Sequence, residues 1–221
     1  MSEMTTSDAA ERLHVSQRQV QRLIRSGELP ARRTAGDAWV LDALAVNALS
    51  RSRPSQGRPW SSESAWGALW MLSGLDAARI DARTRTRLSS RLKAMDAEAL
   101  VHACRRRAEV WRCRASESFL DELRTGLVLS GTSAAGQFGL VGETSKVEGY
   151  CASAAWTAIR SQFRLVDDAR GNATIRVTTQ SSVLRGGYTT MPSAVVAVDL
   201  AESYEPRERA AGLRALQEML G

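Results

Sequence analysis

Residues 6–27 carry two short amphipathic helical patterns with only His14 and Val15 between them. In the first pattern the apolar side chains fall on one face of a helix, and either Thr6 or Ser7 is expected to cap its start. Those apolar residues are Ala9, Ala10 and Leu13. Because the connection is so short, the two helices must pack against each other across a single tight turn, and few folds accommodate that arrangement.

The second pattern has start and stop signals of its own. Ser16 is expected to cap the helix, with Gln19 three residues later completing a capping box, and Gly27 supplies the left-handed residue that ends it. The buried stripe of this helix is predicted to be Val20, Leu23 and Ile24.

The other face of the second helix is rich in arginine and glutamine. Arginine can donate two hydrogen bonds to guanine, and glutamine can both donate to and accept from adenine. With the capping Ser16, the residues expected to contact DNA here are Gln17, Arg18, Gln21, Arg22 and Arg25. This arrangement is typical of a helix-turn-helix that reads the major groove; the alternative is a polar helix face exposed only to water.

Residues 29–40 follow as two short strands around a turn at Ala35–Gly36–Asp37, the pattern of a wing. Arg32 and Arg33 are placed to touch phosphates or a minor groove. Trp39 is expected to anchor the wing to the helices rather than to stack on a base.

The first 49 residues resemble the excisionase-type, MerR-like winged helix-turn-helix. The matching positions are Thr5, Ala9, Ala10, Leu13, Val15, Ser16, Val20, Leu23, Ile24, Gly27, Leu29, Pro30 and Ala31. The resemblance implies a wing and a short closing helix after the two helices, and a double-stranded DNA partner. It also leaves open a phage-type excisionase, a recombination directionality factor that bends DNA.

The whole chain is expected to have an α+β fold, with residues 1–49 as the winged helix-turn-helix. Residues 50–61 are rich in Ser, Pro and Gly and read as a linker, and 62–109 as a helical connector. A mixed α/β domain for dimerisation, sensing or partner binding is predicted for 110–221. Its expected strands are 110–114, 127–129 and 174–178, and its expected helices are 117–123, 152–163, 193–201 and one from Pro206 to the C-terminus.

Two segments of this rear half, 129–140 and 191–200, are similar to the AbiEi-like antitoxins of type IV abortive-infection systems. The similarity lies in a run of small residues, Ser130 to Ala135 followed by Gly139–Leu140, and in the helical run that starts at Pro192. The resemblance implies an antitoxin that represses its own operon and has a cognate nucleotidyltransferase toxin as a partner.

The net charge of +6 is concentrated in residues 1–115 and indicates a polyanionic partner on that side. No apolar run is long enough to cross a membrane, and the N-terminus has no secretory pattern, so a cytoplasmic protein is expected. Its three cysteines, Cys104, Cys113 and Cys151, are then reduced and structural.

Neither an enzyme nor a cofactor or metal site is expected. His14 belongs to the connection of the helix-turn-helix and His102 to the helical connector, which leaves no base for a nucleophile in the rear half. His102, Cys104 and Cys113 lack zinc-ligand spacing, and Gly142–Lys146 is not a phosphate loop. The acidic residues that could hold magnesium are interpreted as caps and surface charge; they are Asp167, Asp168, Asp199 and Glu202.

The densest positive run is Arg105–Arg107, with Arg112 and Arg114 beyond it. Three interpretations stay open: an extension of the DNA footprint, a surface for an acidic partner, or a solvated helix face. The function favoured by the sequence is a sequence-specific transcriptional regulator, an autorepressor that binds a DNA operator as a homodimer on paired half-sites.

Overall fold

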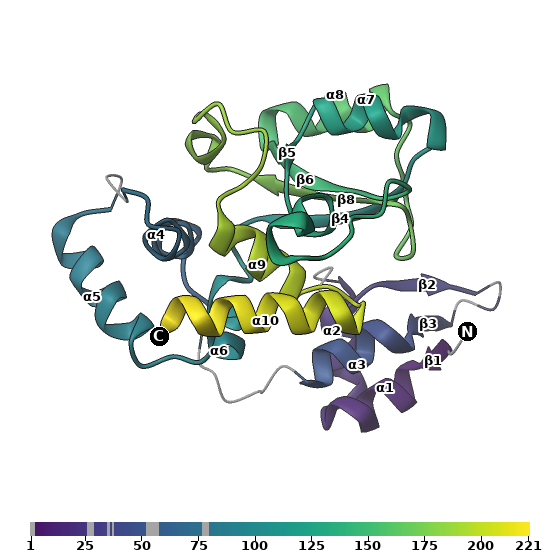
Figure 1. Ribbon diagram of the computed structural model, residues 1–221. Helices are drawn as coiled ribbons and strands as arrows, with labels where there is room; N and C mark the ends of the chain where they lie inside the picture. The colour runs from purple at the N-terminus through teal and green to yellow at the C-terminus, as the bar shows by residue number, and fades with distance from the viewer. Residues whose placement is uncertain (1–2, 26–28, 35, 37, 52–57, 77–79) are drawn as a thin grey trace. The chain divides into compact units, whose positions relative to one another are not determined.

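The computed structural model describes residues 3–25, 29–34, 36, 38–51, 58–76 and 80–221 (Figure 1). The chain divides into two compact units, Met1–Ser55 and Gln56–Gly221. Each unit has helices and strands of its own, which confirms the α+β class. Within the described residues, none of the helices combines the length and the apolar character that crossing a membrane requires.

The N-terminal unit is a small three-helix, three-stranded domain. Its elements are β1 (Glu3–Thr5), α1 (Thr6–Leu13), α2 (Gln17–Arg25), β2 (Ala31–Arg33), β3 (Trp39–Asp42) and α3 (Ala43–Arg51). The strands form an antiparallel sheet in the order β1-β3-β2. The two wing strands and the closing helix are therefore as predicted, whereas β1 was not expected. The buried core is built from small and aliphatic side chains, among them Ala9, Val20, Leu29, Leu41 and Val46.

Helix α1 is capped one or two residues earlier than the sequence predicted. The cap is Thr5, in extended conformation at the end of β1, and not Thr6 or Ser7. Thr5 Oγ1 accepts from the backbone N–H of Asp8 at 3.2 Å, and Asp8 accepts in return from the backbone N–H of Thr5 at 3.2 Å. This reciprocal capping box satisfies two helix-end donors, and it needs an acidic residue three positions after the cap, which only Thr5 has.

The rear unit places a five-stranded sheet between two sets of helices. The strand order is β5-β6-β8-β4-β7, with β6 and β8 parallel and the other pairs antiparallel. The strands are β4 (Glu109–Arg114), β5 (Val128–Leu129), β6 (Val147–Ala152), β7 (Val166–Asp167) and β8 (Ala173–Thr178). The strands predicted at 110–114, 127–129 and 174–178 correspond to β4, β5 and β8, whereas β6 and the short edge strand β7 were missed.

Helices cover both faces of this sheet, as Figure 1 shows for α7 and α8 on one side and α9 on the other. The α-helices are α4 (Ser62–Leu72), α5 (Ala82–Leu92), α6 (Ala97–Cys104), α7 (Leu120–Thr125), α8 (Ser153–Gln162), α9 (Ser193–Ala201) and α10 (Pro206–Leu220). Three short 3₁₀ helices join them: η1 (Glu117–Phe119), η2 (Gly131–Phe138) and η3 (Ser181–Leu184).

The helices predicted as a connector are part of the rear unit's main core. Trp66 and Leu69 of α4 and Leu100 of α6 are buried in one cluster with α9, which has every residue from Ala194 to Ala201 buried. The second cluster lies on the other face of the sheet, under α7 and α8. Residues 58–109 therefore build the rear unit with 110–221, because the apolar faces of α4 and α6 bury against α9 and α10.

Replacing Thr5 by Ala should destabilise the N-terminal unit by about 0.5–2 kcal/mol, because the Asp8 amide loses its acceptor. Thr6→Ala, one position along the chain, should cost less than about 0.5 kcal/mol, as an ordinary substitution does. Urea unfolding together with hydrogen exchange at the Asp8 amide measures both. Equal effects of the two variants would contradict the cap assignment.

Candidate functional site

The turn between α1 and α2 is built on His14. This residue has a left-handed backbone with φ 53° and ψ 43°, and its N–H donates to Glu11 O at 3.1 Å. The next N–H, that of Val15, reaches back to Ala10 O at 3.0 Å. This pair of bonds is a Schellman ending, in which one left-handed residue satisfies the last carbonyls of a helix. It reverses the chain within two residues, so that α2 starts at once.

Ser16 then begins α2 as predicted, with its Oγ accepting from the Gln19 N–H at 3.2 Å. Val20 is fully buried, while Leu23 and Ile24 are half-buried, so the predicted apolar stripe faces the protein. The N–H of Leu29 donates to Leu23 O at 3.0 Å and holds the chain close after the helix. The predicted stop at Gly27 lies outside the described residues.

The arginine and glutamine side chains predicted to contact DNA lie on the other side of α2. Gln17, Arg18, Arg22 and Arg25 are exposed and Gln21 is half-buried. The spacing of these five residues makes a stripe along two turns of a nine-residue helix, about 13 Å long at 1.5 Å per residue. An α-helix with its side chains is about 10–12 Å across, which fits the roughly 12 Å width of the major groove.

The wing is a hairpin of β2 and β3. At its turn the Thr34 N–H donates to Ala38 O at 2.9 Å, and Thr34 Oγ1 accepts from the Ala38 N–H at 3.3 Å. Of the predicted turn residues, Ala35 and Asp37 lie outside the described part of the chain. The hairpin gives the two arginines before the turn a fixed place.

Arg32 and Arg33 are both exposed but differ in their contacts. Arg32 donates to both carboxylate oxygens of Glu3 on β1, at 2.8 and 3.0 Å. Arg33 lies over the ring of its cross-strand neighbour Trp39, 4.7 Å from the ring centre. Exposed ion pairs such as Arg32–Glu3 contribute little to stability, so a phosphate can replace the carboxylate at small cost.

The comparisons with known proteins agree with this geometry. A family model described as a helix-turn-helix domain matches residues 3–53. No curated protein and no solved structure matches the chain at the significance required. The N-terminal unit is therefore a helix-turn-helix domain, the class of domain in which one short helix enters a DNA groove.

The arginine run at 105–107 does not form one continuous exposed surface, as all three interpretations of it assumed. Arg107 is 2% exposed and belongs to the interior of the rear unit. Beyond it, Arg112 lies over the Tyr204 ring at 4.5 Å and Arg114 pairs with Asp168 at 2.7 Å. Only Arg106 of the triplet is fully exposed, since Arg105 is half-buried. The run divides because α6 ends and the chain turns into β4 here.

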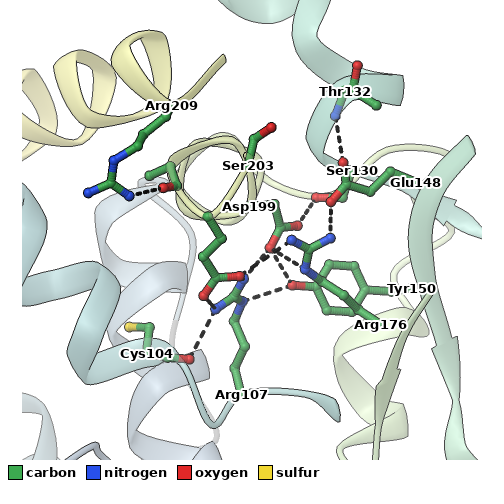
Figure 2. A network of polar contacts seen from close by, with 12 residues as sticks. Cys104, Arg107, Ser130, Thr132, Glu148, Tyr150, Arg176, Asp199, Ser203 and Arg209 are labelled. Carbon is green, nitrogen blue, oxygen red and sulfur yellow. Dashed lines mark hydrogen bonds and ion pairs between the residues drawn. The ribbon is translucent and has the colours of Figure 1, made fainter. Parts of the chain in front are cut away.

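Arg107 is the first centre of a buried ionic network, drawn in Figure 2. Its guanidinium binds Glu202 at 2.8 and 2.7 Å, pairs with Asp199, and donates through Nε to the Tyr150 hydroxyl at 2.9 Å. A further N–H reaches Cys104 O at 3.1 Å. Except for Cys104, these partners all lie far from Arg107 in the sequence. No local sequence pattern therefore predicts the network.

Arg176, 1% exposed on β8, is the second centre. It pairs with Glu148 on the neighbouring strand β6 and reaches Glu202 at 3.4 Å. Its Nε lies 3.0 Å from Asp199 Oδ1 without forming a hydrogen bond, so that contact is an ion pair only. Two arginines thus share three carboxylates. One comes from β6, one from α9, and one from the residue that follows α9.

The remaining bonds hold the carboxylates in place. Asp199 accepts from the hydroxyls of Tyr150, at 2.9 Å, and Ser130. Glu148 accepts from the Thr132 N–H at 3.0 Å, and its carboxylate occupies the space that a side chain on Gly131 would need. Gly131 also has φ +50°, which favours glycine. The turn into η2 is therefore shaped around Glu148.

Burial and charge act against each other on the titrating groups of the network. Burial raises the pKa of Glu148, an effect that Arg176 opposes without cancelling. Burial also raises the pKa of Tyr150, which keeps its hydroxyl protonated as a donor to Asp199. At Glu202 burial is the largest single influence and raises the pKa, but the charges and hydrogen bonds of Arg107 and Arg176 together outweigh it and hold the pKa below its ordinary value. The network is thus a set of paired charges closed by a neutral phenol.

Asp199 and Glu202 are therefore not caps or surface charges, as the sequence suggested. Asp199 is 1% exposed and Glu202 is mostly buried, because each neutralises an internal arginine. Asp167 and Asp168 do lie near the surface, paired with Arg160 and Arg114. Across the described parts of the chain, no three His, Cys, Asp or Glu side chains are grouped so that they could hold a metal ion.

The three cysteines are free and buried. Burial raises the pKa of Cys104 to about 12 and those of Cys113 and Cys151 to about 11. Thiols with such values stay protonated at neutral pH and react slowly, which fits a packing role.

Arg176→Met should destabilise the rear unit by roughly 3–5 kcal/mol, because it leaves buried carboxylates without their counter-charge. The matched substitution Arg114→Met removes an exposed pair and should cost at most about 1 kcal/mol. Denaturant unfolding monitored by tryptophan fluorescence compares the two. A loss for Arg176→Met no larger than for Arg114→Met would show that the network does not stabilise the fold.

Proposed function

We propose that this chain is a sequence-specific regulator that binds double-stranded DNA, a binding protein rather than an enzyme. The observation that carries the proposal is the exposed stripe on α2, presented by a helix whose opposite face is packed into a helix-turn-helix domain. The stripe consists of Gln17, Arg18, Gln21, Arg22 and Arg25. These side chains read base edges in the major groove, while Ser16 and the start of the helix contact the backbone.

The wing supplies the flanking contacts. Arg33 is held in place by its contact with Trp39, which lowers the entropy lost when it meets a phosphate. Arg32 exchanges its Glu3 partner for a phosphate or for the edge of the minor groove. If the Glu3 carboxylate is replaced by a phosphate, the Arg32 guanidinium is paired with an anion both in the free protein and on DNA.

One domain of this size makes few base contacts, so high operator affinity requires two copies on paired half-sites. We therefore place the chain as a homodimer on its operator, acting as a repressor of its own gene. The rear unit supplies the dimer contact or receives a partner.

Arg22→Ala should lose about 1–3 kcal/mol of binding free energy on the specific site and much less on random DNA. The site is first selected from a randomised duplex pool, and affinities are then measured at one fixed salt concentration. Arg83→Ala, an exposed arginine on a helix of the rear unit, serves as the control and should leave both affinities unchanged.

Equal losses on specific and random duplexes would refute base reading by Arg22. An excisionase-type role is the alternative that the same domain allows. Strong bending of the selected site in a permuted-position gel shift would favour that role over repression, because directionality factors work by bending DNA.

A second proposal concerns the rear unit as an antitoxin. The two segments that resemble AbiEi-like antitoxins, 129–140 and 191–200, lie side by side. The Met191 N–H donates to Leu129 O at 2.8 Å, and Ser130 donates to Asp199. Their contact supports treating them as one functional element, and the partner would be a nucleotidyltransferase toxin.

Co-expression of the full chain with a nucleotidyltransferase encoded beside it should restore growth, and the two proteins should co-purify. Arg22→Ala should leave this rescue intact if neutralisation depends on the rear unit. A full chain that neither rescues growth nor co-purifies would end the antitoxin proposal and leave the DNA-binding one standing.

A further inference from the structure

A pocket of about 170 Å³ opens in the rear unit, apart from the helix-turn-helix domain. It is lined by residues of α4, by Asp76 and Ile80, and by residues of the stretch from Gln180 to Tyr188 that contains η3. For scale, an engineered cavity of about 150 Å³ holds one benzene molecule. The pocket is thus large enough for a ligand with a single ring and too small for a nucleotide.

One face of α4 forms a wall with a carboxylate at one end. Glu63, Trp66 and Trp70 are spaced three and four residues apart, so their side chains follow one another along the helix. The two indoles meet edge to face, with ring centres 5.4 Å apart and an interplanar angle of 81°. Because the two rings are nearly perpendicular, a ligand between them would meet the π face of one ring and the edge of the other.

This wall is rigid because the buried network supports it. Trp66, 3% exposed, donates its indole N–H to Arg107 O at 3.1 Å and packs edge to face on Tyr150 at 5.4 Å. The Ser62 hydroxyl reaches the same carbonyl at 3.1 Å. A preformed wall loses little entropy when a ligand binds.

The opposite wall is apolar with a third aromatic ring. Ile80 and Val183 are buried, and the Tyr188 ring, 38% exposed, lies against the backbone of Gly186, where any side chain would overlap it. Three of the chain's twelve aromatic residues therefore line one small pocket. Such a concentration favours a ligand that is aromatic, cationic or both.

The charges at the rim select between these classes. Among the described residues that line the pocket, Glu63 and Asp76 are acidic and Arg185 is basic, and Asp76 is already paired with Arg85 at 3.2 Å. Glu63 continues the aromatic wall along α4, where an ammonium group beside a ring would meet both a carboxylate and a π face.

We infer that this pocket binds a compact organic cation, an ammonium group carried on an apolar body of about one ring. The ring lies in the corner of Trp66 and Trp70, and the ammonium group pairs with Glu63. The site lies wholly within the rear unit, so its test does not depend on DNA binding.

The test is calorimetric titration of the full chain with benzylammonium, benzyl alcohol and benzoate, which share one ring and differ in charge. Benzylammonium should bind most tightly and quench tryptophan fluorescence. Glu63→Gln, which keeps the shape and removes the charge, should weaken benzylammonium roughly five- to tenfold and leave benzyl alcohol unchanged. Trp70→Phe should reduce the quenching.

Glu98→Gln is the matched control, because Glu98 is likewise the second residue of its helix, after the cap Asp96, and lines no part of the pocket. It should bind as the parent does. Benzoate or benzyl alcohol binding as tightly as benzylammonium, an unchanged affinity in Glu63→Gln, or no heat from any of the three probes would each overturn the inference.

Discussion

Two guanidinium groups stand inside the rear unit without access to water, and the surrounding structure must neutralise them. Removing an ion from water costs several kcal/mol, which only close pairing and hydrogen bonding can offset. The carboxylates that do so, on Glu148, Asp199 and Glu202, come from β6, from α9 and from the residue after it, while the arginines come from β8 and from the turn after α6. The central strands of the sheet and the α9 side of this unit therefore contribute to one electrostatic centre, and Trp66 of the pocket wall is bonded to the backbone of Arg107.

The sheet has two chemically different faces as a result. On the central strands, Val147, Cys151, Ile175 and Val177 point to the apolar cluster under α7 and α8. The alternate positions carry Glu148, Tyr150 and Arg176 towards α9, as expected from the two-residue period of a strand. β8 alternates in this way and was predicted as a strand. β6, which lies between β5 and β8, was missed because Gly149, a residue depleted in strands, interrupts its apolar positions Val147 and Cys151.

The features that the sequence predicted are those set by neighbours along the chain. The cap at Ser16, the polar stripe of α2 and the wing hairpin each depend on residues within a few positions, and the structure has all three. The first cap was misplaced because β1, which ends at Thr5 and pairs with β3 some 35 positions away, was not expected, and the local signal of Asp8 three positions after Thr5 was overlooked. Arg107 was read as surface for the same reason, since Asp199 and Glu202 lie 92 and 95 positions further along. Charge runs carry no information on burial until their partners are known.

The placement of Glu148 and Arg176 has a consequence for how β6 and β8 find each other. These strands are parallel, with Tyr150 opposite Arg176, and a slide of one strand by a single residue would turn its alternate side chains to the opposite face. Arg176 would then enter the aliphatic layer with no counter-charge, while Glu148 remained on the other side. Aliphatic residues tolerate such a slip far better than a separated pair of charges does. The ion pair therefore favours the observed register of β6 and β8 over pairings that are shifted by one residue.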